Sequence, residues 1–354
     1  MRRTLPLHPP PIRSYLFNAY PLSILAQADA YLPWLYSTHI QLFNFPGEEL
    51  KFYIQPFSTR HEVRHVYFST CPFLDIQTID RKVLGLATAD LVPWMVSCID
   101  RGYYLQTDVD FFHLPDRPHY QRHHFIHEVL VSGYDTEECT LVLSGFDEQG
   151  AYAVSRMPFD VVERACSFTR EGHIQQALQA GSPLPAWFLQ AMGDRPRVFL
   201  YKYLPDPQYA FDPCAVAEQL TDYLSAADTS QRYRLLAAPR EGGCWGTGVY
   251  SFLRCELENP VAYRDIPWRI LWEHKTCMQA RLQYMEAQGY LDPAEQLGVR
   301  FGVVERKARS LRLVLLRWKT HQRSDTLTRA GAMLDVIATE ERPLLERVLE
   351  ALSR

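Results

Sequence analysis

The sequence has no apolar run of about 18 residues, the length that a membrane-spanning helix needs. Its basic first residues are not followed by an uninterrupted apolar segment, so we expect no secretory signal. The eight cysteines include no CxxC pair and no regular spacing, which argues against a zinc ribbon or a disulfide scaffold. These absences lead us to expect a reduced, cytoplasmic protein that does not associate with membranes.

An excess of positive charge is lacking as well. Lys and Arg number 37 against 41 Asp and Glu, so the formal net charge is -4 and no nucleic-acid partner is expected. The glycine-rich stretch 242–248 lacks the preceding strand and following lysine of a phosphate-binding loop, and it predicts a turn between helices. What the chain does have is 47% apolar residues in 354, enough to bury a large core.

Two short apolar runs, 129–131 and 141–143, predict a β-hairpin, because the residues between them include the turn formers of 135–138. His127 stands at the head of the first strand and Asp147 at the end of the second. Cross-strand neighbours in an antiparallel pair lie about 5 Å apart. A carboxylate at that distance fixes the tautomer of the imidazole, and we therefore predict His127 as a general base oriented by Asp147.

Four histidines crowd this segment: His119, His123, His124 and His127. The residues alone leave open that His127 is an ordinary core or turn histidine, and that the group binds a metal. Strand alternation would turn His124 away from His123 and His127, which leaves at most two ligands in line. We therefore expect no metal site.

The composition divides the chain into three parts. Residues 1–14 are rich in proline and predict an irregular arm. Residues 15–175 mix helical and strand patterns, beginning with a helix from residue 20 to about 43 that Asn18 would cap. Residues 183–354 are almost entirely helical in pattern. We expect an α+β core, with a helix packed on an antiparallel sheet, followed by a largely helical C-terminal region.

A long loop at 108–122 joins two predicted strands and carries clustered aromatic residues and two prolines. Long structured loops often contain functional residues. Asp108 and Asp110 could hold an amine by charge-assisted hydrogen bonds, with Tyr120 as part of the wall. The alternative is that these carboxylates are solvated turn residues.

Several motifs, in their order along the chain, carry a resemblance to a known family. They are Ala19-Tyr-Pro-Leu-Ser-Ile-Leu, Pro33-Trp-Leu-Tyr, Asp100-Arg-Gly-Tyr, His124-Phe-Ile-His-Glu-Val-Leu-Val-Ser-Gly-Tyr-Asp, Ser144-Gly-Phe-Asp, Trp245-Gly-Thr-Gly-Val-Tyr and Asp265-Ile-Pro-Trp-Arg-Ile-Leu-Trp-Glu-His-Lys. In this order the chain resembles the butirosin biosynthesis protein H family, whose core is similar to papain-like cysteine peptidases. The resemblance covers roughly residues 15–170 and 245–290.

This resemblance implies a papain-like acyltransferase acting in antibiotic or other natural-product biosynthesis. Such an enzyme takes an acyl or peptidyl group from the thioester of a carrier protein and delivers it to a small-molecule amine. It needs no cofactor of its own, since the acyl group travels on the phosphopantetheine of the carrier. His127 and Asp147 match the family's base and orienting carboxylate, and the backbone near Ala19, with Asn18, would hold the oxyanion.

The family's cysteine nucleophile has no counterpart here, because the matching position is Ala19. Three explanations stay open: an engineered Cys→Ala substitution, a natural non-catalytic relative, or a register that is wrong by one or two residues. The function therefore has alternatives to acyl transfer. One is an inactive module that binds a carrier protein, and another is a cysteine hydrolase or peptidase.

One predicted helix is strongly basic within a chain that is acidic overall. Between residues 300 and 323 eight Lys and Arg side chains face a single acid, Glu305. A solvated surface is the usual meaning of such a charge run. Carrier proteins are typically acidic, however, and a basic stripe would speed their encounter with the enzyme. We predict that Arg309 and Arg312 belong to a carrier-docking surface.

Overall fold

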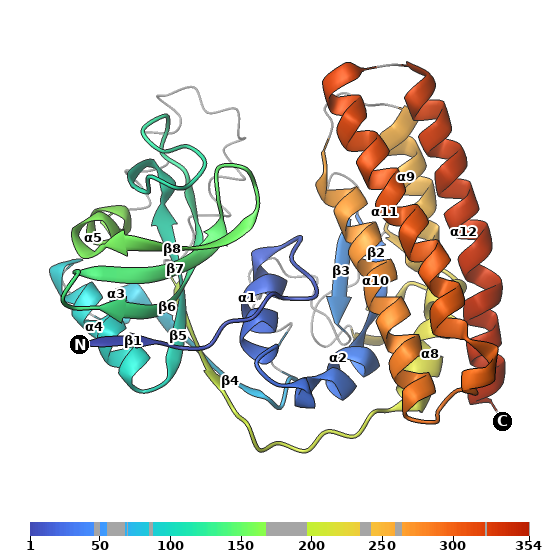
Figure 1. Cartoon of the computed structure of the whole chain (residues 1–354), viewed down its shortest axis with the longest axis horizontal. Coiled ribbons are helices and arrows are strands. Elements are labelled where there is room, and N and C mark those ends of the chain that lie inside the picture. Colours follow the sequence, from blue (N-terminus) through green and yellow to red (C-terminus); the bar gives the residue numbers. More distant parts are fainter. Residues whose placement is uncertain are drawn as a thin grey trace. The chain divides into compact units, whose positions relative to one another are not determined.

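A computed structural model of the chain describes residues 1–45, 50–54, 68, 70–84, 88–167, 197–233, 242–258, 264–322 and 324–353. The chain forms two compact units (Figure 1). Unit 1 comprises Met1–Asp29 and Cys71–Pro207, and unit 2 comprises Ala30–Thr70 and Gln208–Arg354. The predicted boundary between residues 175 and 183 does not coincide with this division, because residues 30–70 group with the C-terminal helices and residues up to 207 belong to unit 1.

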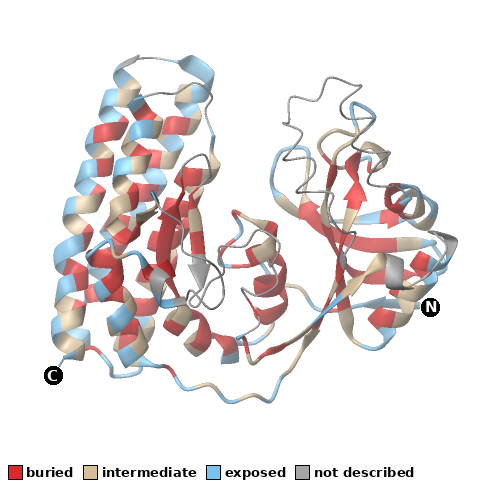
Figure 2. Ribbon diagram, turned by 180° about the vertical axis from the view of Figure 1, so that it is seen from behind, coloured by how far each residue is buried: buried red, intermediate tan, exposed pale blue. Residues whose placement is uncertain are grey.

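Unit 1 is built on an antiparallel sheet of seven strands. Their bounds are β1 (Arg2–Thr4), β4 (Leu74–Asp80), β5 (Tyr103–Asp110), β6 (Ile126–Asp135), β7 (Thr140–Phe146), β8 (Tyr152–Pro158) and β9 (Arg197–Tyr203). The strand order is β4-β9-β5-β6-β7-β8, and β1 also pairs with β6. Buried residues run through the central strands (Figure 2), and on β6 and β7 they include the two predicted apolar runs. The predicted hairpin is thus confirmed as β6–β7.

The first strand corrects the prediction of an irregular N-terminal arm. β1 pairs with β6 antiparallel, with Thr4 opposite Gly133. A Cβ atom at Gly133 would lie only 2.7 Å from the backbone oxygen of Arg3, so only glycine lets the two strands come this close. β9 is a second correction, since it lies in the region predicted to be almost entirely helical.

In the described residues of unit 1, four α-helices accompany the sheet: α1 (Leu16–Leu25), α3 (Arg81–Leu84), α4 (Thr88–Asp100) and α5 (Phe159–Cys166). α4 packs against β5 and β6, and α5 against β5 and β7. α1 begins after Tyr15, which has extended backbone, so Asn18 lies inside the helix and is not its N-cap. An N-terminal helix with an antiparallel sheet is the coarse architecture that the sequence predicted.

The long helix predicted from residue 20 to 43 is in fact three short helices followed by a strand. α1 ends at Leu25, the 3-10 helix η1 (Asp29–Tyr31) leads into α2 (Leu32–Thr38), and β2 (His39–Asn44) follows. All six residues of β2 are buried, with β3 (Lys51–Ile54) on one side and β10 (Cys244–Trp245) on the other. A strand buried on both faces shows no alternation, which is why its apolar residues looked like the end of a helix.

The helices of unit 2 follow the sequence prediction closely. They are α8 (Pro213–Leu224), α9 (Val249–Glu258), α10 (Ile266–Ala287), α11 (Leu297–His321) and α12 (Ser324–Leu352), with the short 3-10 helices η4 (Thr229–Tyr233), η5 (Gly246–Gly248) and η6 (Pro293–Glu295). α11 packs against both α10 and α12. No helix in the described part of the chain combines the length and the apolar character needed to cross a bilayer.

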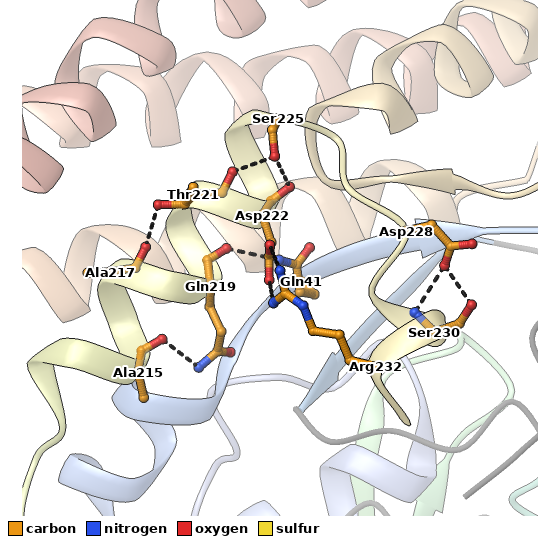
Figure 3. Close-up of polar contacts among 10 residues, drawn as sticks. All are labelled: Gln41, Ala215, Ala217, Gln219, Thr221, Asp222, Ser225, Asp228, Ser230 and Arg232. Carbon is orange, nitrogen blue, oxygen red and sulfur yellow. Dashed lines mark hydrogen bonds and ion pairs between the residues drawn. The ribbon is translucent and has the colours of Figure 1, made fainter. Parts of the chain in front are cut away.

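Side-chain contacts fasten α8 to strand β2 and to the 3-10 helix η4 (Figure 3). Gln41 of β2 donates to the carbonyl oxygen of Gln219 at 2.9 Å, and Asp222 near the end of α8 forms an ion pair with Arg232 of η4. The glycine stretch serves the same packing. Gly246 has φ +49°, and a Cβ there would lie 2.2 Å from the backbone oxygen of Tyr223, so only glycine fits.

A charged cluster lies sealed among the helices of unit 2. Lys275 of α10 donates to Glu341 of α12 at 2.5 Å and to the hydroxyl of Tyr223 at 2.8 Å, and the hydroxyl of Tyr250 also donates to Glu341, at 2.7 Å. The side chains of Lys275 and Glu341 are both 0% exposed. Burial lowers the pKa of Lys275, while the Glu341 carboxylate acts in the opposite direction. We call these four residues, Lys275, Glu341, Tyr223 and Tyr250, the sealed cluster.

Candidate functional site

The polar residues predicted from the loop and the hairpin meet where β5 ends and β6 begins. In the β5–β6 register Asp110 is opposite Ile126 and Val109 is opposite His127. Aromatic and imidazole rings gather around this point: Phe111, Phe112, His113, His119, His123, His124, Phe125 and His127. We call this region the histidine end of the sheet.

Asp110, predicted as a substrate-binding carboxylate, is only 3% exposed. Its Oδ1 accepts the backbone N–H groups of Phe112 at 3.0 Å and Phe125 at 3.1 Å. The first of these bonds caps the 3-10 helix η3 (Phe111–His113), which explains how the turn after β5 forms. Both loop ends are therefore tied to one oxygen, and Oδ2 is turned to a histidine.

That histidine is His124, which the sequence analysis had set aside. Its Nδ1 lies 2.6 Å from Oδ2 of Asp110, and its ring stacks on Phe112 with centroids 4.3 Å apart. Because a carboxylate only accepts, Nδ1 carries the proton and Nε2 of the neutral ring carries the lone pair. This is the tautomer of a general base, whereas binding of one metal ion by both Asp110 and His124 would require Nδ1 to lose this proton. The side chain is 31% exposed, so solutes can reach it.

His113 completes a compact group of possible ligands. One ligand atom from each of Asp110, His113 and His124 can be chosen so that all three lie within 4.8 Å of one another. Burial lowers the pKa of His113, the Asp110 carboxylate opposes that effect, and His124 and Arg164 lower the pKa further. The imidazole is thus held in the neutral form that coordinates metals.

His127, the predicted base, lies two residues along from the Phe125 ring, on which it stacks at 5.6 Å. Its Nδ1 accepts the backbone N–H of Glu128 at 2.9 Å, so in the neutral ring the proton is on Nε2. His124 and His127 therefore hold opposite tautomers, although they are only three residues apart.

The hydrogen-bonded pairing of β6 with β7 does not extend as far as the predicted pair His127 and Asp147. Pairing of β6 with β7 ends at Leu130 opposite Ser144, and β7 itself ends at Phe146. Asp147 instead organises the next turn, where its Oδ1 accepts the N–H groups of Gln149 at 3.0 Å and Ala151 at 2.8 Å. The register, if continued, would set the two side chains opposite each other, and their partnership stays a prediction.

Tyr20 lies where the pairing between β6 and β7 ends. The sequence analysis did not identify its contact with these two strands. Its hydroxyl lies 3.0 Å from the backbone oxygen of Glu128 and 3.1 Å from that of Ser144, so α1 is pinned to β6 and β7 at this level. Burial raises the pKa of Tyr20 well above its usual value, and the neighbouring Tyr152 and Glu128 act in the same direction. The hydroxyl therefore stays protonated and donates.

Ala19, the predicted nucleophile position, precedes Tyr20 and is 0% exposed. The backbone N–H groups of Asn18 and Ala19 both bond to the carbonyl oxygen of Tyr15, at 3.1 and 2.9 Å. Residue 19 is thus within the helix and not at its open N-terminus, and its N–H is already engaged. These two N–H groups therefore serve the helix, and the oxyanion site expected near Ala19 stays a prediction.

The other predicted contacts lie at different places. Asp108 is half-buried on β5 opposite Glu128, and Tyr120 is half-buried in the following loop, where its hydroxyl accepts from Gln121 at 3.1 Å. Arg309 is exposed on α11, as a docking residue should be. Arg312 differs, because it forms an ion pair with Asp265 through two hydrogen bonds of 2.9 and 2.5 Å.

Comparison with known proteins adds no name to these features. No protein-family model matches the chain, and no curated protein matches it. The sequence analysis did not select His113 or His124 as site residues. For His113, one feature of the sequence could have indicated its position. Asp110-Phe-Phe-His113 places an N-cap residue and an imidazole three apart, as a 3-10 turn requires for both to lie on one side.

Proposed function

We propose that the chain is a carrier-dependent acyltransferase with a papain-like core, as its resemblance to the butirosin biosynthesis protein H family implies. One observation carries the proposal: the Tyr20 hydroxyl holds α1 on β6 next to His127, and on β7, which ends one residue before Asp147. A helix that bears the nucleophile position, packed on strands that bear the base, is the arrangement that acyl transfer through a cysteine needs.

In the proposed reaction a thiolate at residue 19 attacks the carbonyl carbon of the carrier thioester. The carrier thiol leaves with a proton from His127, and an acyl-enzyme is formed. The amine then attacks the same carbon, releases the thiolate, and gives its proton to Nδ1 of His127, which first gives up the backbone N–H of Glu128. Alanine cannot form this bond, so the covalent step is proposed for the Ala19→Cys chain only.

A second function, a non-catalytic module that binds a carrier protein, has its own support. Ala19 has no nucleophile, is fully buried, and lies inside α1 with its N–H engaged. Arg309 is exposed and free to meet an acidic partner on α11. A chain with these properties would bind the carrier protein without transferring its acyl group.

Intact-mass measurement separates the two functions. The Ala19→Cys chain is incubated with an acyl-loaded carrier protein, and the chain with Ala19 is the matched control because it keeps all eight native cysteines. The acyltransferase proposal predicts one acyl group on the Ala19→Cys chain and none on the control. Adding His127→Ala should slow acylation at least about 100-fold, the usual contribution of a general base, whereas adding His123→Ala, an exposed neighbour, should not.

Two results would contradict acyl transfer. Equal acylation of both chains would mean that the exposed thiols react without catalysis. Binding of the carrier with no acylation of the Ala19→Cys chain would favour the module.

A further inference from the structure

The Asp110, His113 and His124 side chains come from three separate segments of unit 1. Asp110 ends β5, His113 ends η3, and His124 precedes β6. The 3-10 turn brings His113 to the side of Asp110, and although hairpin pairing does not require His124 to join them, one ligand atom of each can be chosen so that all lie within 4.8 Å of one another. Around a single ion with bonds of about 2.1 Å, tetrahedral ligand atoms are about 3.4 Å apart, which lies within this spread, and binding releases the proton that His124 Nδ1 shares with Asp110 Oδ2.

We propose that Asp110, His113 and His124 bind one divalent transition-metal ion. Two imidazole nitrogens and one carboxylate oxygen are a borderline donor set, which suits Zn²⁺, Co²⁺, Ni²⁺ or Fe²⁺ better than the hard ions Mg²⁺ and Ca²⁺. Three protein ligands leave at least one coordination position for water or a substrate atom.

The surroundings of the carboxylate have the form that metal sites require. Oδ1 of Asp110 is fixed by the N–H groups of Phe112 and Phe125, which orients Oδ2 without using it. The ring of Phe112 stacks on His124 and holds that imidazole in place. The group is buried on the Asp110 side and open on the His124 side, where the side chain is 31% exposed, so an ion has a path of entry.

The competing explanation is a plain structural ion pair, in which Asp110 caps η3 and His124 covers its second oxygen. That explanation accounts for two of the three side chains. It gives His113 no part, although the ring centroids of His113 and His124 are 6.0 Å apart and the His113 ring packs edge-on against Phe112.

The test is calorimetric titration of the full chain, stripped with a chelator and without an affinity tag, with ZnCl₂ and in parallel with MgCl₂. We expect one equivalent of Zn²⁺ to bind at micromolar or lower Kd and Mg²⁺ to bind at least 100-fold more weakly. His113→Gln and His124→Gln should each weaken Zn²⁺ binding at least tenfold. His123→Gln is the matched control and should leave it unchanged.

A second readout uses Co²⁺, whose visible absorption reports nitrogen and oxygen ligands. Its spectrum should be lost in the His113→Gln chain, while far-ultraviolet circular dichroism confirms that the variant is folded. The proposal is overturned if the chain binds no stoichiometric Zn²⁺, or if His113→Gln binds as the unmodified chain does. It is also overturned if His123→Gln is the variant that loses the ion. None of these measurements involves acyl transfer, so their outcome does not depend on the proposed function.

Discussion

Two histidines of unit 2 and one of unit 1 lie in opposite environments. In unit 2, His39 and His274 are 0% and 1% exposed, and each ring lies edge-on to Phe52. In unit 1, His124 is 31% exposed and bonds to a carboxylate that the backbone already holds. A sealed imidazole can only pack, whereas a half-open one beside a fixed carboxylate can exchange a proton or bind an ion. Burial, more than residue type, separates the structural histidines from the candidate site.

The sealed histidines show what burial does to the ring. Burial lowers the pKa of His39 and of His274 well below the usual value, and the neighbouring cations Arg281 and Lys275 act in the same direction. His274 donates from Nε2 to the Ile40 carbonyl oxygen at 2.8 Å, which fixes its neutral tautomer. Neither ring is available to solvent.

The largest effect should come from breaking the sealed cluster. Glu341→Ala leaves the Lys275 ammonium buried without its partner, and we expect a loss of about 3–5 kcal/mol in the free energy of unfolding. Glu340→Ala is the matched control one residue earlier, where the pair with Lys307 is about one-third exposed on each side. That change should cost less than about 1 kcal/mol. Urea denaturation followed by tryptophan fluorescence measures both, and equal losses would contradict the comparison.

A smaller effect should appear with pH. His39 and His274 stay neutral in the folded chain, while in the unfolded chain they take up protons below a pKa of about 6.5. The unfolded state therefore binds more protons as the pH falls, and the stability that is present above pH 6.5 is lost below it. Each histidine should contribute up to about 1.4 kcal/mol per pH unit.

Urea denaturation between pH 7.5 and 5.5 tests this dependence. His274→Gln removes one of the two groups and should reduce the slope by about half, whatever it does to the absolute stability. A stability that does not change over this range would show that the two sealed rings take up protons in the folded chain as they do in the unfolded chain.

The fold was predictable where local patterns matched the final environment. The helices after residue 212 and the β6–β7 hairpin have regular periodicity and clear caps, such as Asp212, whose side chain accepts from Ala215 at 2.9 Å. β2 was not predictable in the same way, because a strand buried on both sides has no period to read. β1 depends on Gly133 and on pairing across 130 residues of chain, which no local pattern reports.

The candidate site was only partly visible for a related reason. Asp110 and the histidine-rich segment stood out by composition. The argument from alternation assumed that His124 already belonged to the strand, but β6 begins at Ile126. In the irregular segment before it, His124 turns to Asp110, and the link to His113 exists only because Asp110 caps η3.

The smallest expected effect concerns the surface of unit 2. Arg309→Glu should weaken binding of an acyl carrier protein roughly three- to tenfold at low salt, because it reverses an exposed charge that would attract an acidic partner. Calorimetry at two ionic strengths should show the difference shrinking as salt screens it. Arg101→Glu, the same charge reversal on an exposed residue of unit 1, is the control. Equal weakening by both variants would place docking elsewhere than on α11.

The contrast between sealed and open histidines can be tested in one experiment, the imidazole ¹H–¹⁵N spectrum of the full chain before and after one equivalent of Zn²⁺. Resonances are assigned from single His→Gln variants. We predict that His124 is protonated on Nδ1 in the metal-free chain, and that Zn²⁺ moves the signals of His113 and His124 while those of His39 and His274 stay in place. Unmoved signals for His113 and His124, or Zn²⁺-induced changes confined to other histidines, would contradict the assignment of the histidine end as the open site of the molecule.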